Sequence, residues 1–233
     1  MKFRNMKSKI NDNVVKLNLR RISKALKNSP EILMESKFKI ASSLILLTKI
    51  KDEYFVILEK RAKKIRQGGE ISLPGGIFDP KKDNNFLTTA LRETEEELGI
   101  DKSKIKTLGK NSIFIAPNGI IIHTFVGFIN YSDAKNSAFN KKEVEDIFFA
   151  PLVFFKYQNP KKYYAALKIH SSLKEDNGED RVLFPAKKLG LPERYWESWG
   201  EGKYEILLYK YNDEFIWGIT AKILKNFVSK IFD

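Results

Sequence analysis

Gly75-Gly76-Ile77-Phe78-Asp79-Pro80 opens the stretch that decides the fold, and Arg92-Glu93-Thr94-Glu95-Glu96-Glu97-Leu98-Gly99-Ile100 closes it. Between them, residues 83–85, an Asp and two Asn, are suited to cap a helix N-terminus, and apolar residues then recur at helical spacing. Gly99 suits the left-handed residue that follows the last turn of a helix. The stretch therefore predicts a turn, a helix and a defined helix end.

Three glutamates of this helix, Glu93, Glu96 and Glu97, are spaced so that they share one arc of its surface, away from the apolar stripe. Like charges this close repel one another. A divalent cation would offset the repulsion, because carboxylate oxygens are the ligands that Mg²⁺ and Mn²⁺ prefer. Arg92 precedes Glu96 by one helical turn and can pair with it, which would hold the acidic face in place. The alternative is a solvated acidic helix face.

The stretch resembles the Nudix box, whose pattern ends in Arg-Glu-x-x-Glu-Glu-x-Gly and an apolar residue, and residues 92–100 match that ending throughout. The first half departs from the general pattern, since the interval from Gly76 to Arg92 is longer and Asn84 stands where an early Glu is usual. Residues 73–80 are instead similar to the Pro-Gly-Gly-x-x-Asp-Pro segment of the coenzyme A pyrophosphatase branch. The resemblance implies an α/β fold, the Nudix-type α/β/α sandwich with a mixed β-sheet.

The segment just before the glycine turn is basic and also resembles the coenzyme A branch. Arg61-Ala62, Arg66 and Gly69-Glu70 follow the upstream signature of that branch, although Gln67-Gly68 lacks its usual His and Leu73 replaces Phe. Because an arginine fork can bind a phosphate through two hydrogen bonds, we expect Arg61 and Arg66 to bind substrate phosphates. The alternative is a solvated Lys-rich loop.

Composition places limits on the function. The chain has 233 residues, 42% of them hydrophobic, and no Cys, which excludes disulfides, thiolate zinc sites and a cysteine nucleophile. We find no apolar run long enough to span a membrane and no apolar signal core, so we expect a cytoplasmic protein without a membrane partner. The net charge of +13 indicates an anionic partner or a Lys-rich bias of the whole surface.

We expect two parts, an N-terminal basic helical arm at residues 1–35 and a Nudix hydrolase domain at 36–233. The arm has mostly helical periodicity over 10–28, and we interpret its cations as a solvated helix face, so we do not expect nucleic acid as a partner. In the domain, 41–47 and 54–58 have the length and composition of two strands of a hairpin. The oligomeric state, including a homodimer, stays open.

Later segments complete the expected domain. We expect strands at 113–115 and 120–128 around the turn at Pro117-Asn118-Gly119, a strand at 204–211 and an amphipathic helix at 216–224. His123 lies in an apolar strand, where a core or edge histidine is the expected role.

Two further segments bear on the site. The layout from Glu143 to Pro151-Leu152 resembles the Nudix family, in which an acidic loop approaches the box, so Glu143 is a candidate ligand or general base, with an exposed loop glutamate as the alternative. Residues 156–204 indicate a hairpin and loop over the substrate cleft. Four aromatic residues of this segment, Tyr163, Tyr164, Tyr195 and Trp196, could stack on a base, and partial burial is the alternative.

The resemblance implies a metal-dependent hydrolysis of the pyrophosphate of coenzyme A, or of its acyl form, to 4′-phosphopantetheine and adenosine 3′,5′-bisphosphate. It implies Mg²⁺ or Mn²⁺ held by Glu93, Glu96, Glu97 and the Gly76 carbonyl, with Glu93 or Glu143 as the base and Arg92 as a catalytic residue that holds the acids. Two rival functions remain. One is hydrolysis of another nucleoside diphosphate derivative, such as ADP-ribose, a dinucleotide or a dNTP, and the other is a non-catalytic nucleotide-binding regulator.

Overall fold

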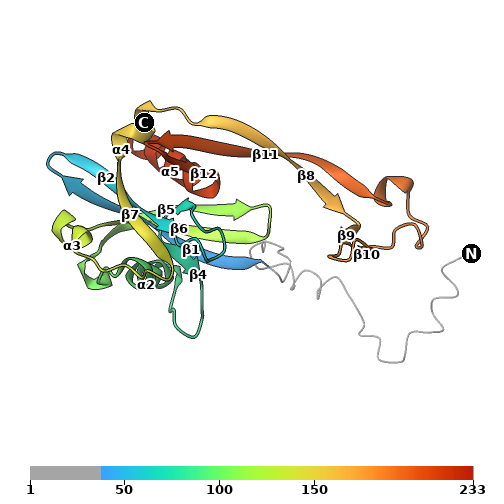
Figure 1. Cartoon of the computed structure of the whole chain (residues 1–233), viewed down its shortest axis with the longest axis horizontal. Helices are drawn as coiled ribbons and strands as arrows, with labels where there is room; N and C mark the ends of the chain where they lie inside the picture. Colours follow the sequence, from blue (N-terminus) through green and yellow to red (C-terminus); the bar gives the residue numbers. More distant parts are fainter. Residues whose placement is uncertain (1–37, 233) are drawn as a thin grey trace, which may run out of the picture. The chain divides into compact units, whose positions relative to one another are not determined.

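The computed structural model describes residues 38–232 (Figure 1), so the expected N-terminal arm and its helix lie outside the described residues. The elements, in chain order, are β1 (Lys39–Ile50), β2 (Glu53–Arg61), β3 (Ile71–Ser72), β4 (Gly75–Ile77), α2 (Phe86–Leu98), the 3₁₀ helix η2 (Lys102–Lys104), β5 (Lys106–Ala116), β6 (Ile120–Phe128), α3 (Tyr131–Lys135), β7 (Val144–Pro151), α4 (Leu152–Tyr157), β8 (Lys161–His170), β9 (Ser172–Lys174), β10 (Asp180–Val182), the 3₁₀ helix η3 (Glu193–Tyr195), β11 (Ser198–Tyr211), β12 (Glu214–Trp217) and α5 (Gly218–Phe232).

Strand β1 lies at the centre of the main sheet, whose order is β3-β2-β1-β6-β5, with β4 paired to β1 and β7 to β2. Its pairing with β2 is antiparallel, with Leu46 opposite Ile57, which confirms the first expected hairpin. Its pairing with β6 is parallel, with Ala41 opposite Ile122. Strands β5 and β6 form the second expected hairpin. The sheet is therefore mixed, as expected.

Two hydrophobic cores lie on opposite faces of this sheet because successive side chains of a strand point to opposite sides. Leu44 and Leu46 of β1 pack with Ala90 and Leu98 of α2 and with Ile57 of β2. The alternate residues of β1, such as Ile45 and Leu47, pack with residues of α4, β11 and α5. Helices thus cover both faces, which confirms the expected α/β/α sandwich.

The ends of α2 follow from local chemistry. The Asn85 side chain accepts a hydrogen bond from Thr88 N at 3.0 Å, and Thr88 Oγ1 accepts one from Asn85 N at 3.1 Å, which is a reciprocal N-terminal cap. Gly99 ends the helix in the left-handed conformation at φ 64°, as expected. A Cβ at Gly99 would overlap the backbone of Ala138, so the position is closed to larger residues.

A second sheet, of order β12-β11-β8, carries the C-terminal part of the chain. The expected strand at 204–211 is the second half of β11, and every residue of β8 is exposed. The helix expected to begin at residue 216 begins two residues later, at Gly218. Ile216 and Trp217 end β12, and α5 begins at Gly218, whose φ of 62° allows the chain to turn from strand into helix. No helix in residues 38–232 is long and apolar enough to cross a membrane.

Candidate functional site

The glycine turn at β4 is held between β1 and α2. Ser42 and Ser43 of β1 pair with Gly76 and Gly75, and Leu44 N donates a hydrogen bond to Pro74 O at 2.9 Å. A Cβ at Gly75 would overlap the Ser42 carbonyl, and a Cβ at Gly76 would overlap the carboxyl group of Glu93. Gly75 is closed to a side chain by backbone atoms, whereas a side chain at Gly76 would have to displace the Glu93 carboxyl group.

Three glutamates lie near this turn, and we call Glu59, Glu93 and Glu97 the carboxylate cluster. Glu97 Oε2 accepts a hydrogen bond from Gly75 N at 2.9 Å. Glu59 Oε1 accepts one from Ser72 Oγ at 2.8 Å. Its other oxygen, Oε2, is buried without a hydrogen-bond partner among the described residues. An unpaired buried carboxylate oxygen is costly, and so it points to a missing electropositive partner.

Burial is the main cause that raises the pKa of each carboxyl group in the cluster, and nearby carboxylates add to the rise. Burial raises the pKa of Glu59 to about 7, and the charges of Glu143 and Glu93 add to the rise, while Ser72 and Arg61 oppose it. Burial, and next the charge of Glu59, raises the pKa of Glu97 to about 9. Burial also raises the pKa of Glu93. The fold therefore holds acids together that repel one another when ionised.

Glu97 corrects the expectation that the three glutamates of α2 share one arc away from the buried side of the helix. It is only 5% exposed, because the glycine turn and β1 pass over that side of the helix. Glu96, by contrast, has a half-exposed side chain that hydrogen bonds with Arg92 at 3.0 Å. The structure thus brings Glu93 and Glu97 to the turn and leaves Glu96 at its outer edge.

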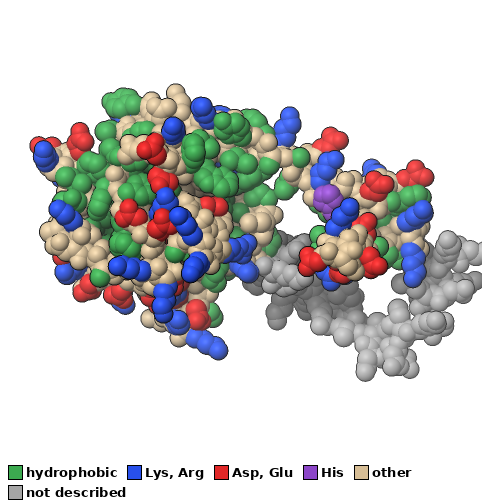
Figure 2. Space-filling model, viewed as in Figure 1, with side chains coloured by type: hydrophobic (Ala, Val, Ile, Leu, Met, Phe, Trp, Pro, Cys, Tyr) green, Lys and Arg blue, Asp and Glu red, His purple; other side chains and the backbone are tan. Residues whose placement is uncertain are grey.

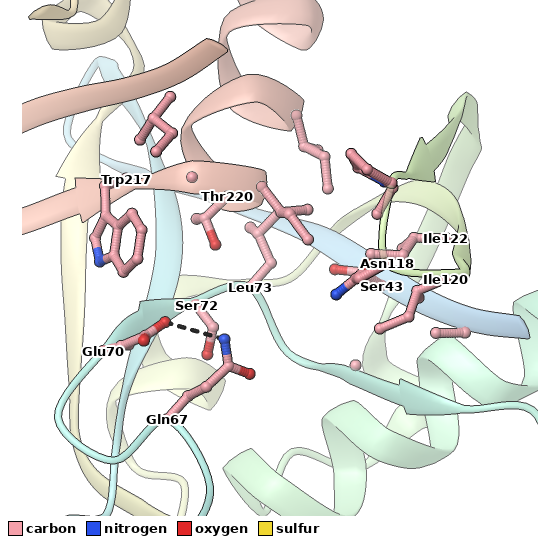
Figure 3. A pocket seen from close by; sticks show the side chains of 18 of the residues that line it. Ser43, Gln67, Glu70, Ser72, Leu73, Asn118, Ile120, Ile122, Trp217 and Thr220 are labelled. Carbon is pink, nitrogen blue, oxygen red and sulfur yellow. Dashed lines mark hydrogen bonds between the residues drawn. The ribbon is translucent and has the colours of Figure 1, made fainter. Parts of the chain in front are cut away.

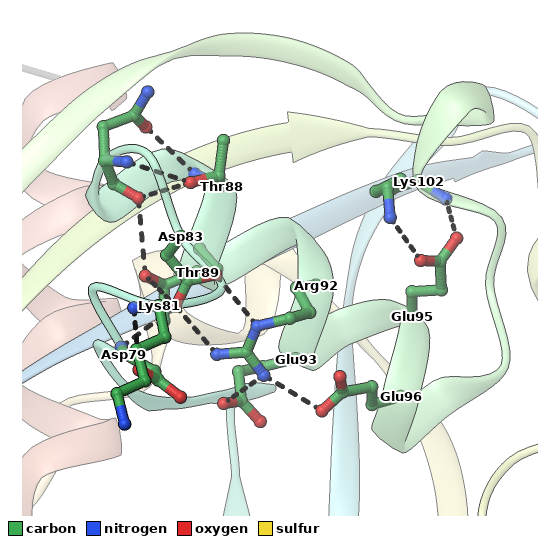
Figure 4. A network of polar contacts seen from close by, with 12 residues as sticks. Asp79, Lys81, Asp83, Thr88, Thr89, Arg92, Glu93, Glu95, Glu96 and Lys102 are labelled. Atoms are coloured by element: carbon green, nitrogen blue, oxygen red, sulfur yellow. Dashed lines mark hydrogen bonds and ion pairs between the residues drawn. The ribbon is translucent and has the colours of Figure 1, made fainter.

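Arg92 links the outer carboxylates to a buried aspartate (Figure 4). Its Nη1 lies 2.8 Å from Glu93 Oε1 and 3.0 Å from Glu96 Oε2, so the expected pair with Glu96 is confirmed. Its Nε and Nη2 each donate a hydrogen bond of 2.9 Å to Asp83. These bonds hold the pKa of Asp83 well below its usual range. Asp83 also accepts from Thr89 Oγ1 at 3.0 Å, so it anchors Arg92 rather than capping the helix.

Glu59 and Asp83 were missed as site residues by the sequence analysis. The signal for Glu59 is its place in β2, where Ile57, Glu59 and Arg61 point to the same face and Ile57 belongs to the core under α2. A carboxylate at an inward position of a strand is a functional candidate. Asp83 is of a residue type that commonly caps helices, and only the folded chain shows that it pairs with Arg92.

Glu143 lies in the turn before β7, in an exposed position. Its charge raises the pKa of Glu59, so the turn faces the carboxylate cluster from another element. The turn is held in place by the Glu143 carbonyl, which accepts a hydrogen bond from Ala62 N at 2.8 Å. His123, in β6, stacks on Phe86 with ring centroids 3.9 Å apart, which accords with the expected structural role.

A cleft of about 580 Å³ lies on the other side of the glycine turn (Figure 3). Gly75, Gly76, Ser72 and Arg61 line it and also contact the carboxylate cluster or its partners, so the cleft and the cluster share this wall. Of the two arginines expected to bind phosphate, Arg61 lines the cleft and the exposed Arg66 does not.

The aromatic residues around the cleft differ from those expected. Tyr204 and Trp217 line it, whereas Tyr163, Tyr164, Tyr195 and Trp196 do not. Trp196 lines a separate cavity of about 840 Å³ in the 170–198 segment. Tyr163 and Tyr164 lie nearer the start of β8 than the cleft-lining residues 165–167, and Tyr195 and Trp196 lie in and after η3, outside the β8 and β11 strands. Figure 2 shows Lys and Arg interspersed with Asp and Glu on the visible face, which accords with a basic bias spread over the surface.

The donor set of this site fits a hard divalent cation, because it consists of carboxylate oxygens with raised pKa values and one unpaired buried oxygen. Among residues 38–232, no group of three such side chains already surrounds a common point. Arg92 accounts for part of this, since it holds Glu93 and Glu96. Binding an ion would therefore require these side chains to rotate.

The class of protein follows from these parts: a glycine turn, a carboxylate-bearing helix and a mixed sheet between helices are the parts of a Nudix hydrolase. A family model described as the NUDIX domain matches residues 38–168, more than half of the chain, and the chain belongs to this family. It is an enzyme of the pyrophosphohydrolase class.

Several known proteins are similar to this chain. The chain is 28% identical over 179 residues to a protein named "Uncharacterized Nudix hydrolase NudL" from Yersinia enterocolitica, which covers 76% of this chain and 73% of that protein. A protein of the same name from Yersinia pestis is also 28% identical, over 76% of this chain and 72% of the relative. A solved MutT/nudix family protein from Enterococcus faecalis is 15% identical, with a TM-score of 0.49 over 92% of this chain and 70% of that one.

Proposed function

We propose that the protein hydrolyses the pyrophosphate bond of coenzyme A or acyl-coenzyme A, giving 4′-phosphopantetheine or its acyl form and adenosine 3′,5′-bisphosphate. One observation carries the proposal. The residues that resemble the coenzyme A branch, among them Arg61, Glu70, Gly75 and Gly76, line one wall of the cleft, directly beside the carboxylate cluster. A substrate pyrophosphate at this wall would lie between an arginine and the acids.

The proposed cofactor is Mg²⁺ or Mn²⁺, held by Glu93, Glu96 and Glu97 with the Gly76 carbonyl, and we add Glu59 because its Oε2 is buried without a partner. When bound, such an ion neutralises charge on the phosphate oxygens and acidifies a water molecule. Ligation accounts for the burial of Glu59, Glu93 and Glu97 close together, because a cation offsets the repulsion between carboxylates.

The chain's own residues have separate tasks in this proposal. Arg61 orients the substrate through its phosphates, since Arg61 lines the cleft. Arg92, anchored by Asp83, fixes the positions of Glu93 and Glu96. The proton of the attacking water goes to Glu93 or Glu143. Burial raises the pKa of Glu93, which favours a general base near neutral pH, while Glu143 faces the cluster from the opposite turn.

The test is incubation with a panel of pyrophosphates in Mg²⁺ or Mn²⁺, with products identified by mass. We expect coenzyme A derivatives to give the two named products and excess EDTA to abolish turnover. Faster hydrolysis of ADP-ribose, a dinucleotide or a dNTP would assign another substrate. Binding without turnover in every case would indicate a regulator. Glu93→Gln and Glu143→Gln identify the base, because only the loss of the base removes the acidic limb of the pH–rate profile.

A further inference from the structure

Strand β8 is an edge strand of the second sheet, whose order is β12-β11-β8. Along one side it pairs with β11, from Lys161 opposite Leu208 to His170 opposite Ser198. No other strand among residues 38–232 pairs with its second side. All 10 residues of β8 are exposed, and Figure 1 shows β8 and β11 running together away from the main sheet toward β9 and β10. The second side of β8 therefore presents backbone N–H and C=O groups to solvent.

The side chains of β8 add apolar surface to this edge. Because successive side chains of a strand point to opposite faces, Tyr163, Leu167 and Ile169 lie on one face. Their exposed fractions are 51%, 47% and 56%. A row of apolar side chains in water beside an unpaired edge is a ready template for an added strand.

The charged side chains of β8 are all basic. The strand carries Lys161, Lys162 and Lys168 and has no Asp or Glu. Within residues 38–232, its only ion pair joins Lys162 Nζ to Glu205 Oε2 at 3.6 Å, between side chains that are 53% and 36% exposed. Such an exposed pair is weak. An acidic strand laid on this edge would therefore meet lysines that have little else to pair with.

The same lysines oppose the pairing of β8 with a second copy of itself. In an antiparallel pairing of two copies about the centre of the strand, Lys161 of one copy would lie opposite His170 and diagonal to Lys168 of the other. Like charges at these positions destabilise a sheet, and β8 has no acid that offsets them. The charges of the edge thus favour an acidic strand over a second copy.

We infer that the outer edge of β8 binds an extended, acidic segment of another protein, which joins the second sheet as an added strand. Backbone hydrogen bonds supply the attraction common to any strand, and side chains select the sequence. The segment that fits has acidic residues on the face of Lys162 and Lys168. It has β-branched residues on the face of Tyr163, Leu167 and Ile169.

The size of the edge sets the strength of this interaction. One added strand buries less area than a permanent complex needs, so the association is reversible, with a dissociation constant of about 10 to 100 μM. The inference is independent of which pyrophosphate the enzyme hydrolyses.

The test is binding of a labelled peptide to the full chain, measured by fluorescence anisotropy at about 0.15 M salt, where distant charges are screened. The probe is an acetylated and amidated peptide of about eight residues in which Val and Glu alternate. A peptide of alternating Val and Lys controls for charge. The Val and Glu peptide with Pro at its centre controls for strand formation, because Pro lacks the N–H that pairing needs. The probe should bind at least about tenfold more tightly than either control and should protect β8 amides from hydrogen exchange.

Two double variants locate the site. Lys162→Glu with Lys168→Glu replaces attractive cross-strand pairs by repulsive ones, so the Val and Glu peptide should bind about tenfold more weakly and the Val and Lys peptide more tightly. Lys51→Glu with Lys210→Glu changes the net charge equally, but Lys51 lies in the turn after β1 and Lys210 lies on β11. This control should bind the probe within about twofold of wild type. Thermal unfolding checks that both variants are folded.

Binding of the probe that protects β8 and is weakened by the β8 variant alone supports the inference. Equal affinity for the three peptides, equal weakening in both double variants, or protection of other strands instead of β8 overturns it. No binding at a peptide concentration of about 1 mM also overturns it. A dimer of the chain whose formation protects β8 amides assigns the edge to a second copy and overturns the inference as well. None of these results bears on the proposed hydrolysis, which the pyrophosphate panel tests separately.

Discussion

The pair between Asp83 and Arg92 should contribute more to stability than any surface ion pair of the domain. The Asp83 side chain is only 1% exposed and that of Arg92 15%. Asp83→Asn keeps the shape but removes the charge that accepts two hydrogen bonds of 2.9 Å. Removing one partner of a buried ion pair lowers the free energy of unfolding by about 3 to 5 kcal/mol. We expect a loss at the lower end of this range, since Arg92 keeps its ion pairs with Glu93 and Glu96.

The assay is urea unfolding of the metal-free protein, with Asp133→Asn as the matched control. Asp133 pairs with Lys104 at 2.7 Å, but both side chains are more exposed, so its loss should lower the free energy of unfolding by less than about 1 kcal/mol. Because Arg92 lowers the pKa of Asp83 below its ordinary value of 3.8, the contribution is present above that value and is lost as the pH falls through the folded pKa. The difference between wild type and Asp83→Asn should therefore shrink on acidification. Equal losses in the two variants, or a difference independent of pH, would refute the reasoning.

Three other outcomes follow from the site. Burial raises the pKa of Glu97 from 4.5 to about 9, so in EDTA the stability of wild type should fall as the pH rises through this range. Glu97→Gln should show a flatter dependence of stability on pH and a higher melting temperature at about pH 8. Coincident curves for the two proteins would contradict this. Gly76→Ala should lower kcat at least about tenfold, because its Cβ would displace the Glu93 carboxyl group, and an unchanged kcat would remove Glu93 from the site. Arg61→Ala should lower kcat/KM for coenzyme A about tenfold and more than Arg66→Ala does, since of these two residues only Arg61 lines the cleft. The ratio of kcat/KM for coenzyme A to that for dephospho-coenzyme A shows whether either residue contacts the 3′-phosphate.

Short-range sequence patterns predicted helix α2 and the two hairpins of the main sheet. The ends of α2 depend on side chains within a few residues, Asn85 and Thr88 at one end and Gly99 at the other, so the sequence specifies them directly. The Arg92 and Glu96 pair spans one helical turn and is equally local. The mixed sheet was expected from the resemblance to the Nudix family, and the two hairpins follow from short apolar runs around turn residues.

Contacts between distant segments could not be predicted in the same way. Helical periodicity places Glu97 on a polar arc, but only the path of β4 over α2 shows that this arc is covered. Glu59 comes from another strand, and nothing near it in the sequence indicates which residues it meets. The aromatic residues of 156–204 depend on how β8 and β11 pair, and a shift of register would change which side chains reach the cleft.

The central position of β1 affects how the two walls of the cleft open. Strand β1 hydrogen bonds with β2, β4 and β6, and its side chains belong to both cores, so its amides should exchange with deuterium only when the whole domain unfolds. Strand β8 pairs with β11 alone among the described strands and is exposed along its length, so its amides should exchange through local opening. The wall that carries the glycine turn should therefore stay fixed while the β8 wall opens, and this opening would let a ligand enter and leave without disturbing the carboxylates.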